Sequence, residues 1–131
     1  MNRGFTLIEL LIVVVIIGII VSIAIPNFIR VSEKAKEASL MSNMHTIQVQ
    51  VELYWINNEH YPANASIITY PPNFKNPWNP QDVPLQDESA PDIRGVVEYK
   101  VNETFDYYWI TGINGRLKPL DLVLTPGKHM F

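Results

Sequence analysis

The stretch that decides the fold runs from Phe5 to Ile25 and reads FTLIELLIVVVIIGIIVSIAI. As a helix rising 1.5 Å per residue it reaches roughly 30 Å, the thickness of the hydrocarbon core of a bilayer. No side of such a helix is polar, so the pattern indicates a membrane span and not a surface helix of a soluble domain. Four residues depart from a plain apolar span: Thr6, Glu9, Gly18 and Ser22.

Glu9 is the one acidic residue inside this stretch. A carboxylate within a span costs about 2.5–3.5 kcal/mol on insertion scales. Two interpretations follow from that cost. Either Glu9 lies close enough to the interface to reach the headgroups, or it awaits a partner of opposite charge.

The flank before the span separates it from an ordinary secretory signal, which has a shorter apolar run and a small-residue cleavage site after that run. Here the small residue, Gly4, precedes the run and follows Arg3. The motif Gly4-Phe5-Thr6-Leu7-Ile8-Glu9 resembles the type III leader of type IV pilins and of the pseudopilins of type II secretion. The resemblance is close from Arg3 to about Pro26 and concerns only the architecture beyond that.

This resemblance implies a processing step and an assembly role. A prepilin peptidase would cleave between Gly4 and Phe5, and the new amine of Phe5 would be methylated. Glu9 and Thr6 would serve in assembly, where the amine of an incoming subunit meets Glu9 of its neighbour. We expect the Phe5 amine and Glu9 to be buried as a pair, because either charge alone is costly in an apolar core.

The resemblance also implies three parts and their locations. Residues 1–4 would be the leader peptide, residues 5–26 the transmembrane and filament-core half of a helix, and residues 27–131 the globular head. The precursor would be a single-pass protein of the bacterial inner membrane, and the mature chain part of an extracellular pilus. Its partners would be other pilin subunits, prepilin peptidase and the pilus assembly machinery of the inner membrane.

Composition limits the remaining possibilities. Of 131 residues, about 105 remain beyond the span, which suffices for one modest domain. The net charge is −3 without a lysine–arginine cluster, so no specific nucleic-acid partner is predicted. Cysteine is absent, which excludes disulfides and thiolate metal sites. Pilins often close a C-terminal loop with a disulfide, so here that loop must be held otherwise.

After the span the apolar period changes, and we expect one helix from about Phe5 to Asn57. Its second half has an apolar stripe suited to packing on a sheet. Val49, Leu53 and Ile56 add a second apolar flank. The stripe comprises Val31, Ala35, Ala38, Met41, Met44, Ile47, Val51 and Tyr54.

Gly18 and Pro26 are the weak points of this helix. Glycine lowers helix propensity, and Pro26 removes a backbone donor and clashes with the carbonyl near Ser22. We expect a kink near Pro26 in a single subunit. The resemblance implies more, namely a helix break between Gly18 and Pro26 once subunits pack in a filament.

Residues 58–95 hold seven of the ten prolines but also interleaved aromatic residues. A disordered linker would lack those aromatics, so we expect an ordered, extended connection. Within it, residues 76–80 read Asn-Pro-Trp-Asn-Pro. They resemble the Asp-Pro-Trp-Gly-Asn-Pro turn of major pseudopilins, with Asn76 in place of the acidic residue.

The last third is typical of strands. Residues 96–101, 105–113 and 120–124 are rich in β-branched, aromatic or alternating apolar residues, and Asn114-Gly115 is a strong hairpin signal. We therefore expect an α+β fold, in which the long helix packs on a small antiparallel sheet of about three strands. This is the ladle-like architecture that the pilin resemblance implies.

No arrangement in the sequence predicts catalysis or a cofactor. His45, His60 and His129 lack metal-ligand spacing, and nucleotide and hydrolase motifs are absent. The acidic run Asp82, Asp87, Glu88 and Asp92 reads as a solvated loop more readily than as a Ca²⁺ site. Major pseudopilins bind calcium near the C-terminus, where residues 112–124 offer only Asp121. Asn64 and Asn102 begin N-glycosylation patterns that we attribute to chance.

The sequence thus predicts a structural protein and no enzyme: a type IV pilin subunit that polymerises through its apolar helix. An alternative is a type II secretion pseudopilin, an interpretation that the missing calcium carboxylates weaken. An alternative of another class is a single-span membrane protein whose ligand-binding domain never polymerises. The sequence does not distinguish adhesion, motility, DNA uptake or conduction as the role of a filament.

Overall fold

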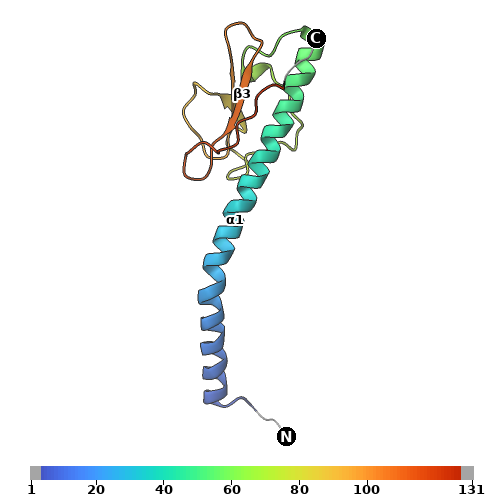
Figure 1. The fold of residues 1–131 in the computed structure, drawn as a ribbon. Helices are drawn as coiled ribbons and strands as arrows, with labels where there is room; N and C mark the ends of the chain where they lie inside the picture. Colours follow the sequence, from blue (N-terminus) through green and yellow to red (C-terminus); the bar gives the residue numbers. More distant parts are fainter. Residues whose placement is uncertain (1–3, 128–131) are drawn as a thin grey trace. The chain divides into compact units, whose positions relative to one another are not determined.

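A computed structural model describes residues 4–127 of the chain. The chain forms two compact units, Met1–Lys34 and Ala35–Phe131. The elements follow in the order α1, η1, β1, β2 and β3 (Figure 1). The α+β class and the count of about three strands are confirmed.

Helix α1 spans Leu7–Asn58, within two residues of the predicted bounds. It remains α-helical through Gly18 and Pro26. Pro26 has no N–H to offer the carbonyl of Ser22, and the Ser22 hydroxyl donates to the carbonyl of Ile19 at 2.7 Å. A filament is not described by one subunit, so the helix break on assembly stays a prediction.

The sheet is mixed and has the order β1-β2-β3. Strand β2 (Val97–Val101) pairs antiparallel with β3 (Tyr108–Gly112), as predicted. Strand β1 (Leu85–Asp87) pairs parallel with β2, with Leu85 opposite Val97. The prediction of an all-antiparallel sheet is therefore wrong at β1, which lies in the proline-rich connection.

The expected strand at residues 120–124 does not form as such. Leu124 of this segment makes an isolated bridge to Ile110, and Pro119, just before the segment, makes another to Ile113. Proline cannot donate to a ladder, and Pro119 and Pro126 flank the segment, so pairing is limited to single points. The Asn114-Gly115 turn is present, since the Asn114 side chain accepts the backbone N–H groups of Arg116 and Lys118 at 2.8 and 3.1 Å.

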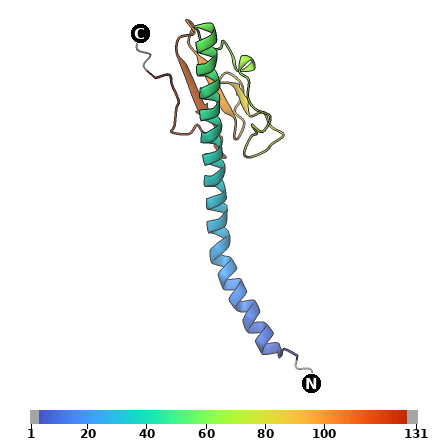
Figure 2. The same ribbon diagram turned by 90° about the vertical axis from the view of Figure 1, so that its right-hand side faces the viewer.

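The core of the second unit lies between the C-terminal half of α1 and the sheet (Figure 2). The helix buries Leu40, Met44, Ile47 and Val51, and the facing strands bury Val97, Tyr99, Tyr108 and Ile110. Sheet and helix approach closely at Gly112, where an added Cβ would lie 2.9 Å from Leu40 Cγ.

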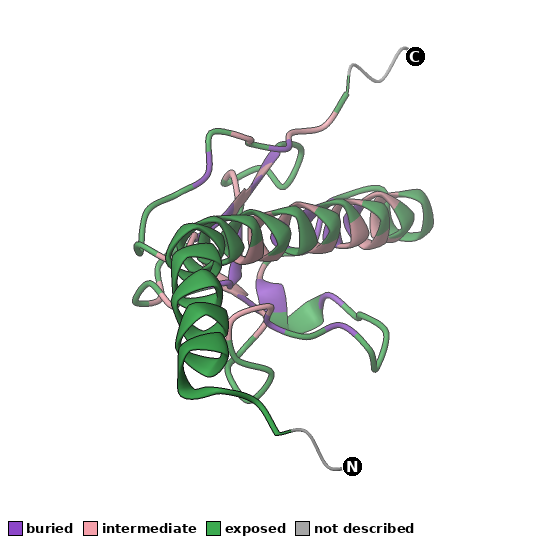
Figure 3. Ribbon diagram, turned by 90° about the horizontal axis from the view of Figure 1, so that it is seen from below, coloured by how far each residue is buried: buried purple, intermediate pink, exposed green. Residues whose placement is uncertain are grey.

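The predicted stripe of α1 needs correction at its N-terminal end. Val31, Ala35 and Ala38 are exposed, and the buried stripe instead begins at Leu40, which the prediction omitted. Val49, Leu53 and Ile56 are exposed too, so the second apolar flank is uncovered. Figure 3 shows buried and intermediate positions of α1 only in the part that carries the head.

The connection from residue 59 to the sheet is ordered and pinned by aromatics, as expected. It contains the short 3₁₀ helix η1 (Ala65–Ile67). Tyr61, Ile68 and Phe74 are buried, and Tyr99 Oη donates to the carbonyl of Pro62 at 2.7 Å. The connection is thus part of the head and not a linker.

Candidate processing and assembly site

The expected cleavage site lies just outside the helix. Gly4 and Phe5 precede the first turn of α1, and the Phe5 side chain is 86% exposed. A Cβ added at Gly4 would meet nothing within 4 Å, so the fold of the chain does not itself require glycine there. The requirement that the pilin resemblance places on Gly4 would come from a protease that approaches the backbone closely.

Glu9 and Thr6 form a capping box at the start of α1. The backbone N–H of Glu9 donates to Thr6 Oγ1 at 3.2 Å, and the backbone N–H of Thr6 donates to Glu9 Oε2 at 3.4 Å. The spacing Thr-x-x-Glu signals this motif in the sequence, and the prediction missed it. The two residues proposed for assembly therefore also order the first helical turn of a single subunit.

The apolar half of α1 is exposed on every side. Residues 4–31 are all exposed, including Leu7 at 88% and Phe28 at 74%. Among the described residues, α1 is the one helix long and apolar enough to cross a membrane. None of its most apolar stretch is buried within the chain, so this surface has to be covered by lipid or by protein from outside.

A buried asparagine organises the turn that resembles the pseudopilin turn. Asn76 is 1% exposed, and its Nδ2 donates to the carbonyls of Arg94 and Val83 at 2.7 and 3.3 Å. Its Oδ1 accepts the backbone N–H groups of Trp78 and Asn79 at 2.9 and 3.3 Å. The two donated bonds need an amide N–H, which the acidic residue of the pseudopilin turn could not supply.

The C-terminal segment is held by hydrogen bonds and burial, in a chain that has no cysteine. Ile110 and Leu124 exchange two backbone bonds of 2.9 Å, and Leu120 N donates to Gly112 O at 2.8 Å. From the helix, Gln48 Nε2 donates to the carbonyl of Thr125 at 3.2 Å. These contacts tie residues 120–125 to both the sheet and α1.

Polar groups of the core meet at Glu52 of α1. Tyr108 Oη donates to Glu52 Oε1 at 2.7 Å, and Tyr61 Oη lies 3.3 Å from Oε2. The rings of Tyr61 and Tyr108 pack edge to face at 4.7 Å. Burial, and secondly the neighbouring Glu52, raise the pKa of both hydroxyls, which therefore stay protonated donors. This network needs residues far apart in sequence, so no local pattern predicts it.

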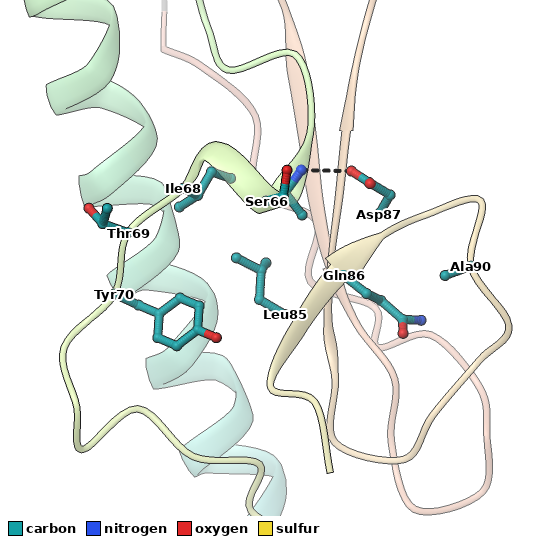
Figure 4. Close-up of a pocket in the computed structure, with 9 residues that line it drawn as sticks. Ser66, Ile68, Thr69, Tyr70, Leu85, Gln86, Asp87 and Ala90 are labelled. Atoms are coloured by element: carbon teal, nitrogen blue, oxygen red, sulfur yellow. Dashed lines mark hydrogen bonds between the residues drawn. The ribbon is translucent and has the colours of Figure 1, made fainter.

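A cavity of about 550 Å³ lies between β1 and the segment that follows η1 (Figure 4). Tyr70, Leu85 and Gln86 line it. At its rim Asp87 Oδ1 accepts the backbone N–H of Ala65 at 2.7 Å. Asp87 thus serves the fold at this cavity.

The carboxylates of the acidic run, Asp82, Asp87, Glu88 and Asp92, do not come together around a common point. Glu88 forms an ion pair with Lys100 at 3.3 Å, while Asp87 caps η1 and Asp121 is exposed elsewhere. Within residues 4–127, no group of three or more His, Asp or Glu residues is placed to hold a metal ion.

The two described histidines lie apart from each other, and the asparagine of one glycosylation pattern is hydrogen-bonded within its own turn. His45 and His60 lie at different points of the head, and His129 is outside the described residues. The His60 ring packs against those of Tyr54 and Phe105 at 5.5 and 6.2 Å. Asn102 Oδ1 accepts the backbone N–H groups of Asp106 and Tyr107, so this side chain shapes its own turn.

Comparison with known proteins agrees with this N-terminal geometry. The family described as "Prokaryotic N-terminal methylation motif" matches residues 1–25. The chain is 40% identical over 75 residues to "Type IV major pilin protein PilA" of Myxococcus xanthus, an alignment that covers 57% of this chain and 34% of that protein. No solved structure matches the chain.

Proteins of type II secretion are similar to it as well. "Type II secretion system core protein G" of Dickeya chrysanthemi is 33% identical over 86 residues, covering 62% of this chain and 56% of that protein. The protein of the same name from Escherichia coli is 38% identical over 62 residues, covering 47% and 43%. The chain thus aligns with between a third and about half of the length of these relatives, and none of the names describes an enzyme.

Proposed function

We propose that the chain is a structural subunit of a type IV pilus. The observation that carries this proposal is the methylation motif followed at once by a helix whose apolar half is exposed on every side. Before assembly that half would lie in the inner membrane, and afterwards in the core of an extracellular filament. Prepilin peptidase would cleave between Gly4 and Phe5 and so free the Phe5 amine. The partners of the mature chain would be other copies of the same chain.

The pseudopilin alternative is supported by the similarity to several core G proteins of type II secretion. Two observations favour the pilin. The alignment with the major pilin has the higher identity, 40% over 75 residues. The head also holds its C-terminal segment with Gln48 and backbone pairing, and this segment carries a single carboxylate, Asp121.

The test is electron microscopy of cells that express the chain, combined with a secretion assay in a deletion strain. Long surface filaments that contain this chain support the pilin. A secretion defect without filaments supports the pseudopilin. If the cells show neither filaments nor a secretion defect, the proposed function is overturned and the single-span, non-polymerising protein is the remaining alternative.

A further inference from the structure

Strand β1 leaves one edge of the sheet open. Among the described strands it comes first in the order β1-β2-β3, so β2 is its one neighbour. Pro84 accepts a backbone N–H from β2 at 2.9 Å, and the backbone N–H of Glu88 donates to β2 at 3.0 Å. In a parallel pair alternate residues bond the partner strand, so the backbone groups of Leu85 and Asp87 point to the other side.

The cavity of about 550 Å³ lies beside this open edge. Figure 2 shows η1 beyond β1, on the side away from β3, and Figure 4 shows Tyr70 and Leu85 on facing walls of the cavity. Within residues 4–127, no hydrogen bond uses the backbone N–H or C=O of Tyr70. The cavity is thus a slot between two stretches of unpaired backbone, and its volume is within the range of about 300–1,000 Å³ that is typical of ligand sites.

The charge around the slot favours a basic occupant. Asp87 is the one charged residue among those that line the cavity. Residues 76–93, which include β1, contain no lysine or arginine and four carboxylates, those of Asp82, Asp87, Glu88 and Asp92. An acidic edge of this kind attracts positive charge and disfavours acidic partners.

We propose that an extended basic peptide from another protein adds to the open edge of β1 as a further strand of the sheet. Its backbone would bond the N–H and C=O of Leu85 and the N–H of Asp87, the mode in which peptides extend an exposed sheet edge. Side chains of a strand alternate between two faces. Every second side chain would therefore enter the slot beside Leu85 and Tyr70, where an apolar residue fits, and the others would be lysine or arginine.

A second copy of this chain does not offer such a peptide within its described residues. Arg116 and Lys118 have the alternate spacing, but Leu117 between them has a φ of +59°, a left-handed conformation that strands do not adopt. The other described lysines and arginines lie in α1 or occur singly elsewhere. The expected partner is therefore a different protein, and the inference goes beyond the proposed function without depending on polymerisation.

The first test asks which groups of a peptide bind. The probe is fluorescein-labelled acetyl-Lys-Val-Lys-Val-Lys-amide, added to the full-length chain in a non-ionic detergent and followed by fluorescence anisotropy. The same peptide N-methylated on its central residues keeps its charges but loses its N–H donors. The peptide Glu-Val-Glu-Val-Glu keeps the donors and reverses the charge.

We expect both control peptides to bind at least about tenfold more weakly than the basic probe. Equal affinity of the N-methylated peptide would show that charge alone attracts the probe, and would overturn the inference. Equal affinity of the acidic peptide, or no binding of the basic probe, would overturn it as well. None of these results bears on filament formation, which electron microscopy decides separately.

The second test places the peptide on the head by means of matched variants. Tyr70 and Tyr107 are 43% and 39% exposed, and only Tyr70 borders the slot. We expect Tyr70→Ala to weaken binding of the basic probe about fivefold and Tyr107→Ala to leave it unchanged. Denaturant unfolding of each variant shows whether its head is folded.

A pair of carboxylates keeps the test decisive if Tyr70→Ala does not fold. Asp87→Asn retains the oxygen that accepts the backbone N–H of Ala65 and removes only the charge. We expect it to weaken binding about threefold, while Asp121→Asn, at an exposed position outside the slot, has no effect. Equal affinities of Asp87→Asn and Asp121→Asn would place the peptide elsewhere and overturn the inference.

Discussion

Thr6 and Glu9 close the first turn of α1 by exchanging hydrogen bonds of 3.2 and 3.4 Å between each backbone N–H and the other side chain. This relationship gives Glu9 a role inside one subunit in addition to the charge pairing proposed between subunits. The two roles need different chemistry. A capping box accepts glutamine as well as glutamate, whereas a partner amine needs the negative charge.

The first prediction separates these roles by comparing Glu9→Gln with Glu9→Val. Both should leave membrane insertion, cleavage and the folded head intact, and both should reduce sheared filament more than tenfold, because the incoming amine is buried without a counter-charge. Only Glu9→Val should also lose the bond that the Thr6 N–H donates to the side chain of residue 9, at a cost of about 1 kcal/mol, while Thr6 Oγ1 still accepts the N–H of residue 9. The readout is sheared filament relative to total membrane subunit. Wild-type assembly of Glu9→Gln would show that Glu9 acts by capping alone.

Processing gives the second prediction. The exposed Gly4–Phe5 bond lies outside α1, so a peptidase can reach it without unfolding a helical turn. We expect the intact mass of the filament subunit to correspond to residues 5–131 plus one methyl group. Gly4→Leu, a larger residue at a site that the chain leaves open, should block cleavage and keep the precursor in the membrane. A filament subunit that still carries residues 1–4 would refute this.

The third prediction concerns the helix between Gly18 and Pro26. In one subunit α1 is regular here, although Pro26 cannot bond the carbonyl of Ser22. In the packed filament we expect this segment to be the least regular part of α1, since neighbouring helices can satisfy its backbone groups. A filament map decides the matter. Unbroken i to i−4 bonding from Leu7 to Asn58, except at Pro26, would contradict the prediction.

Sequence reasoning reached the long helix because its signals are local. The apolar run, the change of period and the ending near Asn57 each depend on neighbouring residues. The same reasoning failed at Val31 and Ala35, because small or apolar residues fit a covered and an uncovered face equally well. Which face the sheet covers depends on contacts with β2 and β3.

Strand β1 and the hydrogen bonds of the Asn76 side chain could not be predicted from local sequence patterns, for the same reason. Leu85–Asp87 is three residues long and lies in a proline-rich segment, and its pairing partner begins at Val97. The replacement of an acidic residue by Asn76 is visible in the sequence. Its cause is not, because the carbonyl of Arg94 that Asn76 binds lies 18 residues further along the chain.

The hydrogen-bonded turn at Asn76 yields the fourth prediction, which concerns the stability of the head. Gly95 has a φ of +78°, and a Cβ there would collide with the Asn76 side chain and lie 2.8 Å from Trp78 Cε3. We expect Gly95→Ala to destabilise the head by roughly 2–4 kcal/mol, through strain and collision together. Asn76→Asp should cost about as much, because a carboxylate would face the carbonyls of Val83 and Arg94 without a proton to donate.

The measurement is denaturant unfolding of the full chain in detergent. Asn79→Asp is the matched control, since the Asn79 side chain accepts a bond from Gln81 N at an exposed position and a carboxylate can do the same. The control should change stability by less than about 0.5 kcal/mol. Equal stability of Asn76→Asp and Asn79→Asp would show that the amide donors of Asn76 contribute little.

The last prediction follows from Glu98, which is 5% exposed on β2. Burial raises the pKa of its carboxyl, the nearby charges of Asp92 and Glu88 raise it further, and the bond from Gln86 Nε2, at 3.2 Å, opposes them. The folded state therefore binds this proton more tightly than the unfolded state. Its contribution to stability is greatest at low pH and falls as the pH rises from about 4.3, the ordinary value for Glu, through the raised pKa of the folded state.

Glu98→Gln removes this titration and keeps an oxygen that can accept the bond from Gln86. We expect the variant to be more stable than the wild type at pH 7, and the difference to shrink as the pH falls toward 4, where Glu98 is protonated in the folded state. Denaturant unfolding of both full-length chains in detergent, from pH 4 to pH 8, gives the difference curve. A flat curve would show that ionised Glu98 is tolerated in the head without a penalty.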